Sequence, residues 1–408
     1  MAKTNPADEV TSRYLEIQAT SAPRTRGADM LLVILCAVLF SGFGILIWVL
    51  PHQSFSPDEN RNLARLPEFS IEALTSGKYT REVGSFYADQ FPLRQYFVGL
   101  KAVCELASLK MQNNNVIPCA GGNLVKRLEY TDYSKAEKNL AAIDRFRDAL
   151  MPQGIPVITA VAPRPVDVLR ASLPPLYGSD RSGRILEVIA ASGTDSVDLL
   201  SPIRSIAEDG EHVWYRTDHH WTTRGAYAAY LELAKKLGYS PKPLSFFEIE
   251  VVSDEFYGTT WSSSGMRWTK PDTIEFYRYT EDEEYTTLNV LTGEITQGFY
   301  ATGYLDTKDK YAAFLGGNSA HVRVAKNNST GRPTLLVVKD SYANALVPFL
   351  AIHFDLEIID LRFYTGSTAA LAVDTKAAAV LILCGADTIA SSDELTLLGY
   401  GLSSLNGR

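Results

Sequence analysis

Two short segments of the sequence combine residues that can carry out nucleophilic chemistry. The first places an acid and two adjacent histidines, Asp218, His219 and His220, directly before a predicted helix. The second places Ser341 just after the apolar run 334–338, where a buried strand is expected to end and a helix to begin. A serine at such a turn exposes its hydroxyl, and its own N–H lies at a helix N-terminus, which suits an attack that creates an oxyanion.

A serine hydroxyl needs a base to accept its proton, and the base needs an acid to hold its tautomer. Asp218 and His220 can supply both groups from one loop, because alternate side chains of an extended backbone share a face and His219 points to the other face. The competing interpretation is structural, since Ser341 and Asp218 are residue types that commonly cap helices. The presence of both segments in one α/β fold favours the catalytic interpretation.

The Asp-His-His cluster also permits a metal-binding interpretation. Carboxylate and imidazole groups bind Mn²⁺ or Zn²⁺, and an Asp-His-His signature marks one family of metal phosphoesterases. Such sites need further acidic or histidine ligands and an acid-rich motif near the N-terminus, which this sequence lacks. The four remaining histidines are scattered along the chain, at His52, His212, His321 and His353. We therefore expect no metal and no other cofactor.

Predicted strands and helices alternate along the part of the chain that carries both segments. This alternation predicts a doubly wound α/β fold with a parallel sheet covered on both faces. Active sites of such folds lie at the carboxyl ends of the strands, where Ser341 is expected. The predicted strands are 155–161, 196–200, 334–338, 356–359 and 378–383, and the predicted helices include 184–191 and 223–237.

The stretch from about 242 to 332 departs from this alternation. It holds 15 of the 43 aromatic residues and few long apolar runs, so it predicts a β-rich insertion. Aromatic residues favour strands, which makes core packing one interpretation, and a wall for stacking sugar rings is the other. The residues concerned include Trp261, Trp268, Tyr277, Tyr279, Tyr300 and Tyr304.

The composition is that of a folded chain with an acidic balance. The 408 residues contain 39 Lys and Arg against 47 Asp and Glu, a formal net charge of −8. Nucleic acid is not an expected partner, because affinity for phosphate backbones depends on clustered basic residues. No Cys-x-x-Cys pair is present, which argues against zinc ribbons and thioredoxin-like chemistry. Cys104 and Cys119 fit either a disulfide or two free thiols.

Residues 30–50 form an apolar stretch of 21 residues without a charge. As a helix rising about 1.5 Å per residue, this stretch reaches the ~30 Å of a bilayer core. We expect a retained single-pass membrane helix rather than a signal peptide, because the stretch is long and no small-residue cleavage site follows. The short tail before it and the large body after it place the body outside the cell membrane. The predicted organisation is a cytoplasmic tail at 1–29, the membrane helix at 30–50, a linker region at 51–130 and the extracytoplasmic α/β domain at 131–408.

The two chemical segments together resemble the DHHW family of bacterial membrane-anchored proteins. This family is related to the alginate O-acetylation proteins and, more distantly, to SGNH hydrolases. The resemblance rests on Asp218-His219-His220-Trp221 and on Lys339-Asp340-Ser341-Tyr342-Ala343-Asn344. Weaker matches are Glu59-Asn60-Arg61, Asp89-Gln90-Phe91-Pro92-Leu93-Arg94, Phe256-Tyr257-Gly258-Thr259, Gly316-Gly317-Asn318 and Asp360-Leu361-Arg362.

The resemblance implies a catalytic triad on an SGNH-like sheet that is circularly permuted. In this triad Ser341 is the nucleophile, His220 the base and Asp218 the residue that orients the base. The family's Gly-x-Asn oxyanion block corresponds to Gly385-Ala386-Asp387, and an ionised Asp387 cannot donate to an oxyanion. Either Asp387 lies outside the oxyanion hole, or the N–H groups of Ser341 and Gly385 do that work. Further candidates for oxyanion or substrate binding are Gly385, Asn318, Arg362, Tyr342 and His219.

The resemblance further implies a membrane-anchored serine O-acyltransferase. It would move an acyl group, most simply acetyl, to a cell-surface or exported polysaccharide through an acyl-Ser341 intermediate. Its expected partners are the polysaccharide and a multi-spanning membrane acyltransferase that brings the acyl group across the membrane. Two alternatives stay open, namely a carbohydrate O-acetylesterase of the same fold and a non-catalytic polysaccharide-binding or scaffold protein, which Asp387 favours.

Overall fold

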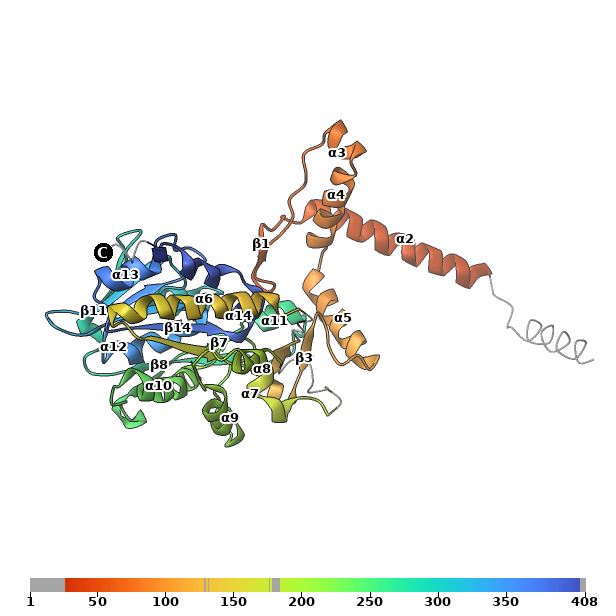
Figure 1. Ribbon diagram of the computed structural model, residues 1–408. Coiled ribbons are helices and arrows are strands. Elements are labelled where there is room, and N and C mark those ends of the chain that lie inside the picture. The colour runs from red at the N-terminus through yellow and green to blue at the C-terminus, as the bar shows by residue number, and fades with distance from the viewer. Residues whose placement is uncertain (1–25, 128–129, 131, 176, 178–183, 404–408) are drawn as a thin grey trace, which may run out of the picture. The chain divides into compact units, whose positions relative to one another are not determined.

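The computed structural model describes two compact units of the chain (Figure 1). The smaller unit carries an apolar helix, and the larger unit carries an α/β domain. The units comprise Met1–Ser56 with Arg61–Phe97 and Pro57–Asn60 with Val98–Arg408. The described residues are 26–127, 130, 132–175, 177 and 184–403, so the predicted tail at 1–29 lies almost wholly outside them.

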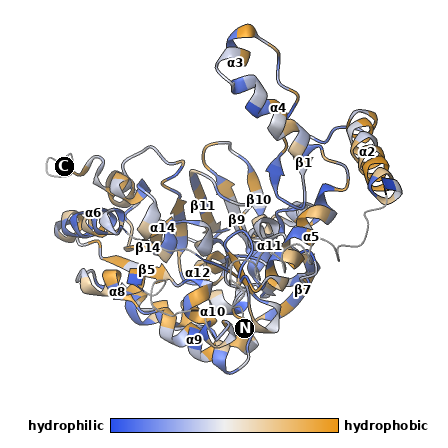
Figure 2. Ribbon diagram, turned by 90° about the vertical axis from the view of Figure 1, so that its right-hand side faces the viewer, coloured by the Kyte–Doolittle hydropathy of each residue, from blue (hydrophilic) through white to orange (hydrophobic). Residues whose placement is uncertain are grey.

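The smaller unit is built around helix α2 (Arg26–Val49), which is hydrophobic along most of its length (Figure 2). Among the described residues it is the one helix long and apolar enough to cross a membrane. Its C-terminal half packs on aromatic rings of the same unit, with Phe43 stacked 4.9 Å from Phe91 and Trp48 lying 6.1 Å from Phe86. The helix therefore fits either a single-pass membrane anchor or a signal sequence.

Within the smaller unit, an ion pair joins Arg61 and Asp89, one residue from each of two family-like segments. Asp89 accepts two hydrogen bonds from the Arg61 guanidinium and one, of 2.8 Å, from the Ala64 N–H. The hydrogen bonds from Arg61 lower the pKa of the Asp89 carboxyl. These segments therefore have a structural role in this unit. Its remaining elements are β1 (Phe55–Ser56), β2 (Arg61–Asn62), α3 (Ile71–Thr75), α4 (Lys78–Asp89) and the start of α5 (Arg94–Ala107).

The larger unit contains an eight-stranded sheet with the order β10-β9-β11-β13-β12-β14-β5-β6. The five strands from β13 to β6 are parallel, and β11, β9 and β10 extend them antiparallel at one edge. The parallel strands are β5 (Val157–Ala162), β6 (Ser196–Val197), β12 (Thr334–Lys339), β13 (Asp355–Ile359) and β14 (Ala379–Gly385). The predicted strands are thus confirmed, but the sheet is mixed where the sequence predicted a parallel one, because part of the insertion joins it.

The order of the parallel strands confirms the circular permutation. Read across the sheet, β13-β12-β14-β5-β6 corresponds to the doubly wound order 2-1-3-4-5. The last two strands of that order, β5 and β6, precede the first three along the chain. The loop that carries Asp218 and His220 follows β6, so it comes before the strand that carries Ser341.

Helices cover both faces of the sheet, as expected for strands that are apolar on both sides (Figure 1). Alternate residues of β12 point to opposite faces: Leu335 and Val337 belong to one core, and Leu336 and Val338 to the other. The first core includes residues of α9 (Leu200–Glu208), α10 (Thr223–Leu237) and α12 (Val347–Ala351). The second includes residues of α6 (Ser134–Leu150), α8 (Arg184–Ala191), α13 (Thr368–Asp374) and α14 (Ala386–Ser391).

The insertion is β-rich, as predicted, and most of its aromatic residues serve the core. Four of the six aromatic residues named from the sequence are buried, and Trp268 and Tyr304 are exposed. Phe276 and Tyr300, for example, stack with ring centroids 3.9 Å apart. Core packing is therefore the main role of these rings. The strands here are β7 (Glu248–Phe256), β8 (Asp272–Arg278), β9 (Tyr285–Asn289), β10 (Ile295–Gln297) and β11 (His321–Lys326).

All four cysteines are free, so Cys104 and Cys119 are two thiols and not a disulfide.

Shorter elements complete the larger unit. The short elements are β3 (Val116–Pro118), β4 (Leu124–Lys126), α7 (Pro165–Val168), α11 (Thr259–Ser264) and the 3₁₀ helices η7 (Lys310–Ala313) and η8 (Ser341–Leu346).

Candidate active site

Ser341 lies at the turn between β12 and η8, as the sequence predicted. Asp340 caps η8, because its carboxylate accepts a hydrogen bond of 3.1 Å from the Tyr342 N–H. The other carboxylate oxygen accepts bonds of 2.7 Å from the Gly385 N–H and from the Thr388 hydroxyl. Asp340 thereby ties the turn to the end of β14. Ser341 takes the first position of the helix, where its N–H has no intrahelical acceptor.

The acid–base pair lies on the loop between α9 and α10, and not on a strand of the sheet. Thr222 caps α10 by accepting a hydrogen bond of 3.3 Å from the Gly225 N–H. The Trp221 indole N–H donates a bond of 3.0 Å to the Tyr342 carbonyl, which lies next to Ser341. This bond links the loop to the nucleophile's helix and gives the tryptophan of the motif a structural role.

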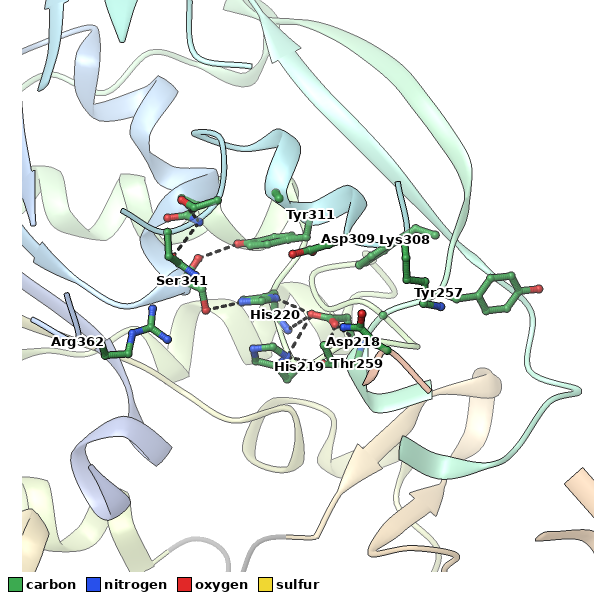
Figure 3. A pocket seen from close by; sticks show the side chains of 17 residues that line it. Asp218, His219, His220, Tyr257, Thr259, Lys308, Asp309, Tyr311, Ser341 and Arg362 are labelled. Atoms are coloured by element: carbon green, nitrogen blue, oxygen red, sulfur yellow. Dashed lines mark hydrogen bonds and ion pairs between the residues drawn. The ribbon is translucent and has the colours of Figure 1, made fainter. Parts of the chain in front are cut away.

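Asp218, His220 and Ser341 form a continuous hydrogen-bonded relay (Figure 3). His220 Nδ1 lies 2.5 Å from Asp218 Oδ1, and His220 Nε2 lies 2.7 Å from Ser341 Oγ. The carboxylate therefore places the ring proton on Nδ1 and leaves Nε2 to accept the serine proton. The predicted meeting of these three residues is confirmed, and His220 rather than His219 contacts the serine.

The turn before α11 holds the Asp218 carboxylate in place. Oδ2 accepts a hydrogen bond of 2.7 Å from the Thr259 N–H and one of 3.0 Å from the Thr259 hydroxyl. A Cβ added to Gly258 would lie 2.3 Å from Asp218 Cβ, so only glycine fits there. Burial would raise the pKa of Asp218, but the adjacent His219 and His220 hold it well below its usual range. Asp218 is therefore a carboxylate with a fixed orientation.

The two adjacent histidines have pKa values shifted in opposite directions. Burial lowers the pKa of His220 to about 4, and the positive charge of His219 contributes to the same shift. Burial also acts to lower the pKa of His219, but the nearby Asp218 carboxylate outweighs it and raises that pKa. His219 Nδ1 lies 2.8 Å from the Thr259 hydroxyl. The pKa values of the two histidines therefore shift in opposite directions, and His220 is neutral near neutral pH and able to accept a proton.

Tyr311 completes the surroundings of the base. Its ring stacks on the His220 imidazole with centroids 3.8 Å apart and an interplanar angle of 6°. Its hydroxyl donates a hydrogen bond of 3.2 Å to the Ser341 carbonyl. The imidazole lies between this ring and His219, whose ring centroid is 3.7 Å away. The packing restricts rotation of His220 away from the serine.

The relay opens into a pocket of about 260 Å³. Of the further candidates, His219, Asn318 and Arg362 line this pocket, together with Tyr257, Lys308 and Asp309. Arg362 lies on the Ser341 side, Lys308 and Tyr257 lie on the opposite side, and Asp309 lies between Tyr311 and Lys308 (Figure 3). The Arg362 guanidinium is held by two hydrogen bonds to the Asp360 carboxylate. The pocket thus presents a cationic group on each side of Ser341, and aromatic Tyr257 on the side of Lys308.

Two of the predicted oxyanion or substrate-binding residues, Gly385 and Tyr342, do not line the pocket. The Gly385 N–H already donates to the buried Asp340 carboxylate, so it cannot serve an oxyanion. Tyr342 is buried, and its hydroxyl donates a hydrogen bond of 2.8 Å to the His219 carbonyl. Both residues hold the site together and neither lines the pocket.

Asp387 lies outside the pocket. The first of the two alternatives for Gly385-Ala386-Asp387 therefore holds. Its carboxylate accepts a hydrogen bond of 3.1 Å from the Tyr130 hydroxyl and lies 4.0 Å from an Arg164 nitrogen. Burial raises its pKa. Asp387 is a partner of this separate polar cluster and not an oxyanion donor.

Comparison with known proteins agrees with the fold and the motifs. Residues 125–289 match the SGNH hydrolase-like domain of the acetyltransferase AlgX. A probable alginate O-acetylase AlgJ from Pseudomonas syringae pv. tomato is 27% identical over 183 residues, 42% of this chain and 46% of that protein. The AlgJ of Pseudomonas fluorescens is 27% identical over 174 residues, 40% of this chain and 43% of that protein. The chain is thus similar in sequence to the SGNH-like alginate O-acetylation proteins. The matches span less than half the length of these AlgJ proteins.

Solved structures of other proteins share the fold of this chain. A DHHW family protein from Eubacterium siraeum superposes with a TM-score of 0.59 and 22% identity, covering 70% of this chain and 95% of that one. Bacillus cereus PatB1, solved with a sulfonyl adduct, gives a TM-score of 0.57 and 19% identity over 68% and 97%. These likenesses establish the architecture of the α/β domain.

The sequence analysis did not predict a role at this site for Thr259, Lys339 or Tyr311. Thr259 carried a signal, because it belongs to one of the family-like segments. Lys339 also lies in such a segment, but nothing local showed that its ammonium group is buried. Tyr311 carried no signal, since its stacking partner His220 is distant along the chain.

A metal ion at Asp218, His219 and His220 would compete with the hydrogen bonds of the relay. The ligand atoms of Asp218, His219 and His220 lie within 4.8 Å of one another, a spacing that suits an ion. Both ring nitrogens of His220 are already engaged, one by Asp218 and one by Ser341. An ion bound to His220 would therefore have to displace one arm of the relay.

Proposed function

We propose that this chain is a membrane-anchored, extracytoplasmic serine O-acyltransferase that acylates, most simply acetylates, a cell-surface or exported polysaccharide. The observation that carries the proposal is the continuous relay from Asp218 through His220 to Ser341 beside an open pocket. The relationship to alginate O-acetylases and to the AlgX domain supports acetyl as the group and a polysaccharide as the acceptor.

The relay allows a two-step transfer through an acyl-serine. His220 Nε2 takes the Ser341 proton as Oγ attacks the acyl carbonyl carbon of the donor ester, and it returns that proton to the leaving oxygen. In the second step a sugar hydroxyl gives its proton to His220, attacks the acyl carbon and releases Ser341 Oγ, which recovers the proton. The Ser341 N–H is one donor for the oxyanion of each tetrahedral intermediate.

The membrane helix and the lack of acetyl-CoA outside the cell shape the rest of the proposal. A retained α2 would keep the α/β domain beside the membrane surface. An acyl donor would reach it from a multi-spanning membrane acyltransferase. The same triad with water as acceptor would give an esterase, so the acceptor decides between transfer and hydrolysis.

The test is a transfer assay with 4-nitrophenyl acetate and a panel of oligosaccharide acceptors. Nitrophenolate release reports formation of the acyl-enzyme, and mass spectrometry of the acceptors reports acetyl transfer. Transfer that disappears in Ser341→Ala supports the proposal. Nitrophenolate and free acetate with no acetylated sugar would identify an esterase. No Ser341-dependent release and no labelling of Ser341 by a phosphonate would leave the scaffold alternative.

A further inference from the structure

Aromatic rings pack on helix α2 at two different depths. Near the C-terminal end of the helix, Trp48 lies 6.1 Å from the Phe86 ring of α4. Further back along the helix, Phe43 stacks on Phe91 with centroids 4.9 Å apart and meets Phe97 edge-on at 5.9 Å. Phe91 follows the end of α4, and Phe97 belongs to the first turn of α5. The turn between α4 and α5 therefore contacts α2 well before that helix ends.

This contact lies inside the stretch that is expected to span the membrane. The apolar run 30–50 is just long enough for the ~30 Å of a bilayer core, and the charged residues Arg26 and Asp29 mark its inner end. Phe43 precedes the outer end of the run by seven residues. At about 1.5 Å per residue, that is a depth of about 10 Å. A ring stacked on Phe43 must lie at a similar depth, within the outer half of the bilayer.

Polar groups of this turn are hydrogen-bonded within the smaller unit, as contact with lipid requires. The Gln90 side chain donates a bond of 2.9 Å to the Gln53 carbonyl and accepts one of 3.1 Å from the Gln53 N–H. Pro92 has no N–H, and the Tyr96 N–H donates a bond of 2.9 Å to the Leu93 carbonyl. The acid at the end of α4 is neutralised in the ion pair described above. These bonds reduce the cost of moving the turn out of water.

The same turn exposes apolar side chains. Leu93 is 62% exposed, Tyr96 77% and Phe97 44%. Leu93 has a φ of 59°, in the left-handed region that a leucine rarely adopts. Arg94, the charged residue beside it, donates its Nε–H to the Ala88 carbonyl at 3.0 Å. Lipid contact takes the leucine side chain out of water and gives the tyrosine ring the interfacial position that tyrosines favour.

We propose that the turn between α4 and α5 lies in the outer leaflet of the membrane against α2, with Leu93 and Tyr96 in contact with lipid. The inference rests on the proposed function, because it requires α2 to be a retained membrane helix. The smaller unit is then an anchor made of one spanning helix and one inserted turn. Phe43 holds Phe91 and Phe97 at this depth, so removal of α2 also releases the turn.

The test measures the depth of single positions in the full chain, reconstituted in vesicles of phosphatidylcholine and phosphatidylglycerol. Each chain carries a nitrobenzoxadiazole label on one introduced cysteine. Three native cysteines, Cys36, Cys104 and Cys119, are first replaced by serine. The buried Cys384 is kept, and the parent without an introduced cysteine gives the background of labelling.

The label should report lipid at the turn and water elsewhere in the smaller unit. At Leu93→Cys and Tyr96→Cys, doxyl-labelled phosphatidylcholine should quench the fluorescence, and iodide in the water should quench it little. Lys78→Cys is the matched control and should show the reverse, because this residue of α4 has a side chain that is 63% exposed.

A second pair of variants tests the packing on α2. Phe43→Ala should reduce lipid quenching at the Leu93 position, because Phe91 and Phe97 lose the ring that holds them. Phe40→Ala is its control, since Phe40 also lies in α2 and is 73% exposed. Equal quenching in both variants would overturn the role of Phe43 in holding the turn.

The outcomes separate this inference from the proposed function. Iodide quenching at Leu93 and Tyr96 equal to that at Lys78, in a chain that resists carbonate washing and keeps its N-terminal peptide, would overturn this inference alone. A chain released by carbonate, or lacking that peptide, would overturn the membrane anchor of the proposed function and this inference with it.

The unlabelled parent decides if the labelled variants lose the parent's thermal transition. A phospholipid with a photoactivatable acyl chain should then modify the tryptic peptide 82–94, which cleavage after Arg81 and Arg94 releases. Modification of α2 peptides without modification of this peptide would overturn the inference.

Discussion

The relay makes distinct demands on its three residues. In the proposed mechanism, Ser341 loses a proton and His220 accepts it. Asp218 only orients the imidazole and stabilises its charge. We expect His220→Ala and Ser341→Ala to lower turnover by at least ~10³-fold, and Asp218→Ala somewhat less. Turnover of 4-nitrophenyl acetate by folded variants provides the measurement.

His219→Ala is the matched control for that series. It should retain more turnover than His220→Ala, because His219 does not contact the serine. The assignment of the base would be reversed by an inactive His219→Ala beside an active His220→Ala. Equal loss from both, together with bound metal in the parent, would favour the metal interpretation.

The charges of the two histidines predict a shifted pH profile. His220 accepts a proton only when neutral, and its pKa is lowered to about 4. The value of kcat/KM should therefore fall as the pH drops through about 4, and not through the ~6.5 of an ordinary histidine. His219→Asn removes a positive neighbour, so the pKa of His220 should rise and the acid limb should move to higher pH.

The measurement is kcat/KM against pH for the parent and for His219→Asn. Recovery of activity after return to pH 7 separates titration from unfolding. A parent profile centred near 6.5, or an acid limb that moves to lower pH in the variant, would contradict the charge assignment.

At the scale of elements, the junction of β7 and α11 depends on the absence of a side chain. Gly258 has an ordinary negative φ of −83°, so its requirement is steric and not conformational. We expect Gly258→Ala to displace Asp218 or the turn, to lower turnover about 10-fold or more and to lower the melting temperature. Overpacking of this kind costs about 1–3 kcal/mol.

Gly303→Ala is the control for that substitution. Gly303 also lacks a positive φ, and an added Cβ would meet nothing within 4 Å. Kinetics and thermal melting of the two variants give the comparison. Equal behaviour of both glycine variants would show that the turn accommodates a methyl group and that Asp218 is less constrained than its contacts indicate.

At the scale of the whole molecule, the two units predict separate consequences of truncation. The cores of the α/β domain lie outside the smaller unit. A chain lacking residues 1–52 should therefore leave the membrane fraction and keep the turnover of the full chain. Phe86 and Phe91 lose their packing on α2, so proteases should cut the remainder of the smaller unit first.

Membrane fractionation, limited proteolysis and the esterase assay measure these outcomes. Carbonate washing of membranes with the full chain, and the mass of its N-terminal peptide, distinguish a retained anchor from a cleaved signal sequence. Aggregation of a folded truncation would reveal a membrane-facing surface on the α/β domain.

Local patterns in the sequence determined much of the fold. Mostly apolar runs of four to seven residues predicted the parallel strands, because a strand buried on both faces cannot carry polar alternation. The helix at 223–237 was predicted with its observed bounds, since Gly238 adopts the left-handed conformation that ends it. The Asp-x-His spacing and the serine at a strand end predicted that Asp218, His220 and Ser341 would meet, as they do.

Tertiary structure alone decided which groups are left free to act on a substrate. His220 and Ser341 are 121 residues apart, and only the strand order and the packed loop bring them to 2.7 Å. The same packing engages the Gly385 N–H with Asp340, stacks Tyr311 on His220 and brings the Asn318 amide oxygen to Lys339. Burial periodicity and capping are local properties that a sequence displays. The partner of a hydrogen-bonding group is set by segments distant along the chain, and so it appears only in the folded protein.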